Sequence, residues 1–66
     1  MQHYRFYYLD ESSKFIDFGE DDFADESLAV AVAQQRLARR PRQIVEVWRQ
    51  TTMIYRGKSN LAPAPL

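Results

Sequence analysis

One segment of this chain has the composition of a helix, and it lies between two pairs of segments that have the composition of strands. From Glu26 to Arg40 the chain is rich in alanine, leucine, glutamine and arginine, which are good helix formers. Pro41 ends this segment, because the residue before a proline disfavours the helical region. One helix can cover only one face of a sheet, so the second face of any sheet here has no helix to cover it.

The segments on either side of the helix alternate between two sets of side chains, as strands do. Residues 2–9 and 15–19 form one predicted hairpin, and residues 43–50 and 53–56 form the other. Aromatic and β-branched residues, which favour strands, are frequent in them. The chain is therefore predicted to be an α+β domain: a four-stranded antiparallel sheet (ββαββ) with one helix packed on one face, in two layers.

The length of the chain, 66 residues, allows one domain with a small core. The strand and helix pattern covers residues 1–57, which we predict to be that domain. Residues 58–66 contain two prolines and no periodicity, which predicts a flexible C-terminal tail.

Alternation along the strands predicts which residues share a face. Under the helix we expect Tyr4, Phe6, Tyr8, Ile16, Phe18, Val45 and Val47. On the opposite face we expect Arg5, Tyr7, Leu9, Asp17, Ile44, Glu46 and Trp48. The pattern leaves open which face takes Met53, Ile54 and Tyr55, because a slip of one residue exchanges the two sets. Large apolar side chains fall on both faces in either register.

The formal net charge of zero hides a split along the chain. Up to Ala33 there are two basic and eight acidic residues, and after it seven basic and one acidic. One interpretation is local: acids precede the helix, with Asp22 or Asp25 as its N-cap, and bases follow it, as the helix dipole favours. The other is that an acidic surface meets a basic one in a partner or a second copy.

The residues that carry most enzyme chemistry are scarce. There is no cysteine, and His3 is the single histidine. The acidic segment from Gly19 to Asp22, with Asp17 and Asp25 nearby, lacks the ligand spacing of a calcium loop. We therefore predict a protein that is not an enzyme, with no catalytic residues, no metal site and no cofactor.

The chain also lacks the features of a membrane or secreted protein. No run of about 18 apolar residues is present, so no membrane span is expected. The first residues do not have the apolar stretch of a signal peptide. We expect a cytoplasmic protein.

Self-association is the function that the pattern favours. A sheet face that carries Tyr7, Ile44, Trp48 and Tyr55 exposes an apolar patch, and such patches mark interfaces. These four residues are the predicted protein interface, with a second copy (a homodimer) or another protein as the partner. An edge strand of the sheet is the other surface through which two copies could pair. Doubling the chain also stabilises so small a domain.

Nucleic-acid binding, as in an antitoxin-like regulator, is the alternative. Arg36, Arg39, Arg40 and Arg42 lie at or just past the end of the helix, and phosphate contacts need such a group of bases. The zero net charge and the absence of an RNA-binding signature count against it.

The residues from Tyr4 to Asp10 and from Ile44 to Arg49 resemble those of small bacterial, proteobacterial-type ββαββ proteins of unknown function. The similarity covers residues 4 to about 57 and consists of the strand and helix pattern. It implies the same fold and no assigned activity, so no functional residue follows from it. The strand and helix layout has a weaker similarity to antitoxin-type domains.

Overall fold

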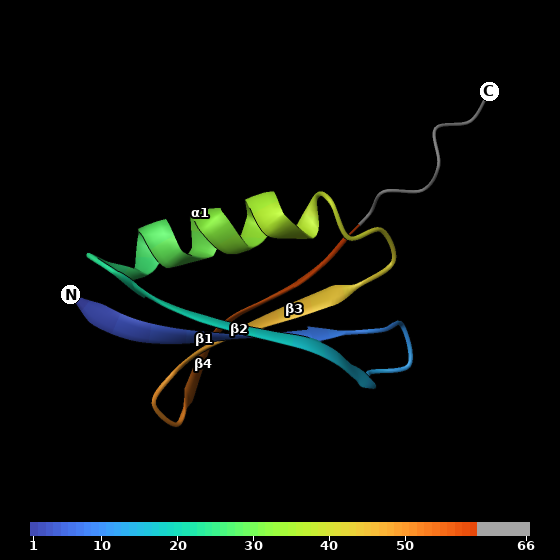
Figure 1. Ribbon diagram of the computed structural model, residues 1–66, viewed down its shortest axis with the longest axis horizontal. Helices are drawn as coiled ribbons and strands as arrows, with labels where there is room; N and C mark the ends of the chain where they lie inside the picture. Colours follow the sequence, from blue (N-terminus) through green and yellow to red (C-terminus); the bar gives the residue numbers. More distant parts are fainter. Residues whose placement is uncertain (60–66) are drawn as a thin grey trace.

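The computed structural model describes residues 1–59, and it has the predicted ββαββ order. Its elements are β1 (Gln2–Leu9), β2 (Phe15–Phe23), α1 (Glu26–Leu37), β3 (Ile44–Arg49) and β4 (Thr52–Lys58). The four strands form one sheet in the order β2-β1-β3-β4, with all neighbours antiparallel (Figure 1). The predicted fold class, an α+β domain with a four-stranded antiparallel sheet and one helix, is confirmed.

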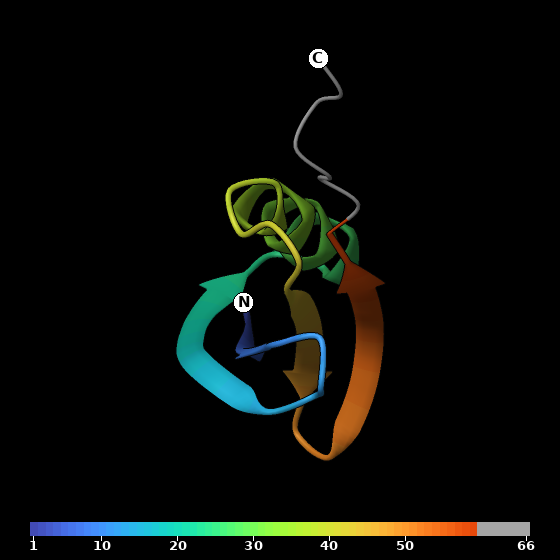
Figure 2. The ribbon, with the colours of Figure 1, turned by 90° about the vertical axis from the view of Figure 1, so that its right-hand side faces the viewer.

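The helix and the turn between β3 and β4 lie on opposite sides of the sheet. Figures 1 and 2 show α1 along one face, while the turn from β3 into β4 extends away from the helix. Ala29 and Ala33 are fully buried where α1 meets the sheet. Because alanine is small, the helix packs close to the strands.

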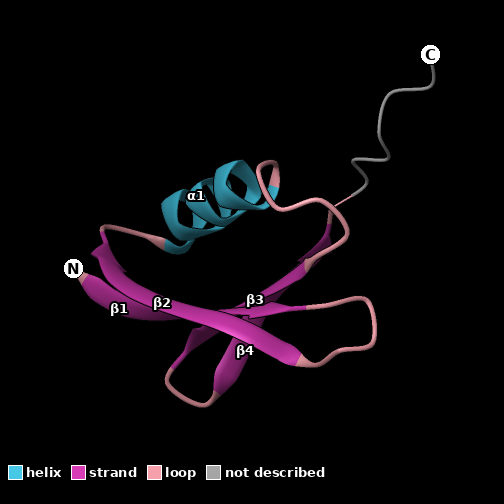
Figure 3. Ribbon diagram, turned by 45° about the vertical axis from the view of Figure 1, so that its right-hand side comes forward, coloured by secondary structure: helices cyan, strands magenta, loops and turns pink. Residues whose placement is uncertain are grey.

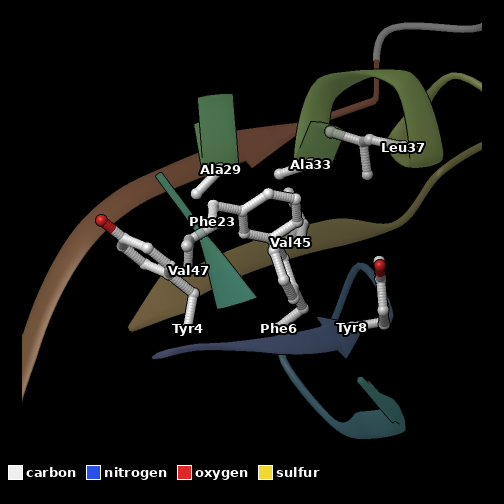
Figure 4. Close-up of a cluster of buried hydrophobic side chains, with 9 residues drawn as sticks. All are labelled: Tyr4, Phe6, Tyr8, Phe23, Ala29, Ala33, Leu37, Val45 and Val47. Atoms are coloured by element: carbon white, nitrogen blue, oxygen red, sulfur yellow. The ribbon is translucent and has the colours of Figure 1, made fainter. Parts of the chain in front are cut away.

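The core lies between α1 and the sheet. It is a single cluster of Tyr4, Phe6, Tyr8, Phe23, Ala29, Ala33, Leu37, Val45 and Val47 (Figure 4). The ring centroid of Phe23 is 6.0 Å from that of Tyr4 and 5.9 Å from that of Phe6. Such tilted and edge-on contacts between aromatic rings add to the free energy gained from burial.

The start of the helix resolves one alternative left by the sequence. Asp25 has an extended backbone, and its Oδ1 accepts the backbone N–H of Leu28 at 2.9 Å. Asp25 is therefore the N-cap. Asp22 instead belongs to β2, where it pairs with His3.

The boundaries of four elements differ from the prediction, and β3 (Ile44–Arg49) is shorter than expected by one residue at each end. β2 continues through the acidic residues to Phe23, because these residues pair with β1 along their whole length. The helix ends at Leu37, where the following turn tightens: the N–H of Arg40 donates to the carbonyl of Leu37 at 2.9 Å. β4 includes Lys58, so the predicted tail boundary at residue 57 is one residue too early.

The residue after β4 is also part of the fold. Ser59 is buried, and its N–H donates to the carbonyl of Gln43 at 2.9 Å. The remainder of the predicted tail, residues 60–66, lies outside the described residues.

The predicted faces are correct for β1 and β3 and wrong for β2. Ile16 and Phe18 are 45% and 41% exposed and do not belong to the core. Phe18 pairs with Tyr7 on the face away from the helix, while Asp17 pairs with Tyr8 and lies on the helix side. Extending β2 brings Phe23 into the core in their place.

The open face of the sheet as a candidate interaction surface

The face of the sheet turned away from α1 is built from alternate residues of all four strands. Cross-strand partners share a face, and the register places on this one His3, Arg5, Tyr7 and Leu9 of β1, Phe15, Phe18, Glu20 and Asp22 of β2, Ile44, Glu46 and Trp48 of β3, and Met53, Arg56 and Lys58 of β4. We call this surface the open face. No other helix or strand within residues 1–59 lies over it (Figure 3).

Aromatic side chains cluster on the open face at β1 and β2. The ring centroid of Tyr7 is 5.3 Å from that of Phe18 and 6.5 Å from that of Phe15. Phe15 is 61% exposed and Phe18 41%. On the same face, at the opposite edge of the sheet, Met53 of β4 pairs with Trp48 and is 43% exposed. Large apolar side chains gathered on one exposed surface are typical of a binding site.

A shallow groove of about 460 Å³ crosses the centre of the open face. It is lined by Arg5, Tyr7, Leu9, Glu46, Trp48, Gln50 and Thr51. The last two belong to the β3–β4 turn, which walls one end. Arg5 connects this turn to β1, because its guanidinium donates to the backbone carbonyl of Gln50. The same guanidinium donates to the hydroxyl of Tyr7 at 3.0 Å.

Glu46 organises the β3 side of the groove. Its Oε1 accepts the indole N–H of Trp48 at 3.0 Å, and its Oε2 lies 3.4 Å from Nε of Arg56. The Trp48 ring is thereby held by a hydrogen bond within its own strand. Polar groups that are already paired inside the chain lower the cost of covering this surface with a partner.

His3 lies between two carboxylates at the end of the open face. Its Nδ1 is 2.7 Å from Oδ1 of Asp22, and its Nε2 is 2.9 Å from Oε2 of Glu20. The hydrogen bond to Glu20, followed by that to Asp22, raises the pKa of His3. Sequence reasoning missed this contact, because it depends on β2 continuing through the acidic residues. No group of three or more metal-ligating side chains within the described residues is arranged to hold a metal ion.

Three of the four predicted interface residues lie on the open face, and Tyr55 does not. Tyr55 pairs with Val47, packs against the core on the helix side, and its ring lies over Gly57. The irregularity between Val47 and Trp48 inserts an extra residue in β4, which reverses the simple alternation. Ile44 lies on the open face but is only 7% exposed. Tyr7 and Trp48 therefore remain as predicted anchors that are accessible there.

The four arginines of the alternative prediction differ in their surroundings. The guanidinium of Arg36 lies 5.1 Å from the ring centroid of Phe6, and that of Arg40 lies 3.9 Å from that of Tyr8. Arg39 and Arg42 are exposed. Two of the arginines therefore cover the edge of the core beside the helix.

Arg40 also forms an ion pair with β2. Its Nη2 lies 2.7 Å from Oδ2 of Asp17. The hydrogen bond from Arg40 is the main cause that lowers the pKa of Asp17, and the N–H of Phe18 adds to it. Asp17, predicted on the opposite face, thus acts on the helix side of the sheet.

Comparison with protein-family models, with curated proteins and with solved structures gives no match. The resemblance to small bacterial proteins stays a prediction from the sequence. Within residues 1–59, no helix has the length and apolar character needed to cross a membrane.

Proposed function

We propose that this protein is a non-enzymatic interaction module that self-associates through the open face of its sheet. The observation that carries the proposal is the exposed aromatic cluster of Tyr7, Phe15 and Phe18, which continues across the groove to Trp48 and Met53. Nothing else within residues 1–59 covers this cluster, although the helix side of the same sheet is buried.

Pairing through the sheet edges is the competing way to self-associate, and the edge at β2 is protected. Oδ1 of Asp17 accepts the N–H of Phe18, and Oδ1 of Asp21 accepts the N–H of Asp22, both at 2.8 Å. These backbone groups are therefore occupied by carboxylates. Charged side chains on an edge strand oppose the addition of another strand. The other edge strand, β4, also opposes the addition of a strand, because it carries an irregularity and two basic residues.

The size of the open face predicts a reversible dimer. Four strands about 4.8 Å apart, with about 3.3 Å per residue, span roughly 20 Å in each direction. A surface of this extent lies at the low end of specific interfaces, which bury about 1,200–2,000 Å² in total. A weak, reversible dimer has a dissociation constant of roughly 1 µM to 1 mM, and this sets the range of concentrations to test.

The proposal is tested by sedimentation equilibrium over that range of concentrations, with three variants beside the wild type. Phe18→Ala and Trp48→Ala remove apolar contacts from the open face, and we expect each to raise the dissociation constant about tenfold or more. Leu28→Ala is the matched control, because Leu28 on α1 is 47% exposed and lies away from the open face. It should leave association unchanged.

Two results would contradict the proposal. One is a wild-type protein that remains monomeric at every concentration. The other is an association that Leu28→Ala weakens as much as Phe18→Ala does. Thermal melts of the same variants show whether Trp48→Ala acts on folding instead: equal loss of stability and association would make Trp48 a structural residue.

Nucleic-acid binding is the alternative function, and it is tested with the same protein. A titration with single- and double-stranded oligonucleotides at low salt should show no binding. Binding that weakens steeply with salt, and that is lost in the variant Arg39→Ala with Arg42→Ala, would favour the rival.

A further inference from the structure

The groove on the open face extends along β1 and β3, and its two ends differ. The β3–β4 turn walls one end. Leu9 lines the other end, where it pairs with Ile44 of β3, and Ile44 pairs with Lys58 of β4. The last residues of β4 therefore lie beside the end of the groove that is away from the turn (Figure 1). The chain continues from there into residues 60–66, which we call segment 60–66.

The groove is apolar, and its charged side chains already have partners. Tyr7, Leu9 and Trp48 line it and are half-buried. The guanidinium of Arg5 and the carboxylate of Glu46 form hydrogen bonds with other groups of the chain. A charged ligand would have to break these bonds to find a partner of opposite sign among the lining residues. An uncharged, apolar ligand fits this groove without that cost.

Segment 60–66 has the matching chemistry. Its sequence is Asn-Leu-Ala-Pro-Ala-Pro-Leu, which contains two prolines, two leucines and no charged side chain. Proline fixes the backbone dihedral φ near −65° and favours the extended polyproline II helix. Such chains bind in grooves lined by aromatic side chains, because a chain that is already extended loses little conformational entropy on binding.

We infer that segment 60–66 docks in the groove of its own chain, with its prolines and leucines against Tyr7 and Trp48. The groove has the aromatic lining that such a segment needs, and the segment starts beside the groove. A segment joined directly to β4 has an effective concentration at its own groove in the millimolar range. At protein concentrations below this, docking within one chain is favoured over docking into a second copy.

The length of the segment is sufficient for this path. From Leu9 to Arg5, the partner of Trp48, β1 advances by roughly 13 Å at about 3.3 Å per residue. The step from β4 to the line between β1 and β3 adds a sideways displacement of roughly 7 Å, so the direct path is about 15 Å. Asn60 is of a type common in turns. After a turn there, residues 61–66 span roughly 19 Å as a polyproline II helix.

A docked segment opposes self-association. It covers Tyr7 and Trp48 and leaves Phe15 and Phe18 uncovered, while a second copy on the open face needs both parts of that surface. This consequence rests on the proposed function, whereas docking itself does not. If the segment is docked for half of the time, the competent fraction of each copy is halved, and the dissociation constant of the dimer rises about fourfold.

Trp48 reports on docking directly, because it is the single tryptophan of the chain. The segment variant is the full chain with Leu61→Ser, Pro63→Ser and Pro65→Ser. Its fluorescence emission and its quenching by acrylamide are compared with those of the wild type below about 1 µM, where a weak dimer is dissociated. We expect emission of the segment variant to shift to longer wavelengths and its quenching constant to rise, because water and acrylamide then reach the indole.

The matched control is Leu28→Ser, which also replaces an exposed apolar residue by serine but on α1, away from the groove. It should leave the emission and quenching of Trp48 unchanged. Circular dichroism establishes that both variants are folded. Equal emission and quenching in the wild type and the segment variant would overturn the inference.

A peptide with the sequence of residues 60–66 tests the fit of the groove. Titrated into the segment variant up to millimolar concentration, which matches the effective concentration of the joined segment, it should return the emission of Trp48 toward the wild-type value. The same peptide with Pro63→Ser and Pro65→Ser should have a smaller effect. Equal effects of the two peptides would contradict recognition of the prolines.

Sedimentation equilibrium separates this inference from the proposal beneath it. We expect the segment variant to dimerise with a dissociation constant at least about fourfold lower than that of the wild type. Trp48→Ala should weaken association more in the segment variant than in the wild-type chain, because in the wild type it also releases the docked segment.

The two failures are distinguishable. A changed emission of Trp48 with an unchanged dissociation constant would mean that docking does not control self-association. If the wild type and the segment variant are both monomeric at every concentration, the proposed function fails, and the emission of Trp48 still decides whether the segment docks.

Discussion

The two faces of this sheet carry similar side chains and differ in what covers them. β1 contributes Tyr4, Phe6 and Tyr8 to the helix side, where they are at most 3% exposed. Tyr7 lies between Phe6 and Tyr8 in the same strand, and its side chain points to the open face, where it contacts Phe15 and Phe18. One helix of 12 residues covers the first set. The second set has the same chemistry without a cover inside residues 1–59.

This difference separates stability from binding within one strand. A residue on the helix side stabilises the fold by burial in a closed cluster. An exposed residue of the open face, such as Phe18, buries less surface in the fold, and in the proposed function its apolar surface binds a partner. The polar groups follow the same division. Arg36 and Arg40 lie over core rings. Arg5, Glu46 and His3 form hydrogen bonds with other side chains of the open face.

The largest expected effect contrasts one phenylalanine from each face. Phe6→Ala removes a ring that is fully buried, and such substitutions cost about 3–5 kcal/mol of unfolding free energy. Phe18→Ala removes a ring that is 41% exposed, and we expect a loss of about 1 kcal/mol or less. Urea unfolding at low protein concentration, where the chain is monomeric, measures both.

A domain with a stability of about 5 kcal/mol is close to unfolding after the loss of Phe6. Phe6→Leu, which keeps most of the apolar volume, then gives a measurable intermediate value. Similar losses for Phe6→Leu and Phe18→Ala would mean that the open face belongs to the core, against the division described above.

The sequence was sufficient to predict the order of the elements and the core residues on β1 and β3. The central strands β1 and β3 have neighbours on both sides. Their buried residues alternate with open-face residues without interruption: Tyr4, Phe6, Tyr8, Val45 and Val47. In such strands alternation alone decides which face is buried. The face that Tyr7 and Trp48 occupy follows from the same rule.

The two outer strands could not be predicted in this way. β2 continues through Glu20, Asp21 and Asp22, residues that are rare in strands, because pairing with β1 stabilises them there. An irregularity beside β2 and another in β4 shift the alternation by one residue. These shifts reversed the predicted faces of Phe18 and Asp17 and placed Tyr55 on the helix side. The contacts of His3 depend on the same extension of β2.

A smaller effect is expected at the edge of the helix side. Arg40→Ala removes the guanidinium that lies 3.9 Å from the ring centroid of Tyr8, a contact that contributes about 1 kcal/mol. Arg39→Ala is the matched control, because Arg39 is the neighbouring arginine and is exposed. Thermal melts of the two variants should differ, with the lower melting temperature for Arg40→Ala. Equal melting temperatures would show that Arg40 does not stabilise the core.

The smallest effect is a dependence on pH at the acidic end of the open face. The two carboxylates beside His3 raise its pKa in the folded chain above the ordinary value of 6.5, so they favour the charged imidazole. The stabilisation is therefore fully present below pH 6.5 and is lost as the pH rises through the raised pKa. His3→Gln removes it, as does the variant Glu20→Gln with Asp22→Asn. We expect the difference in melting temperature between the wild type and His3→Gln to shrink as the pH rises from 5.5 to about 8.5.

The titration of Asp17 does not interfere, because its pKa is lowered from 3.8 and lies below this range. A difference that stays constant with pH would mean that His3 acts by packing on the open face.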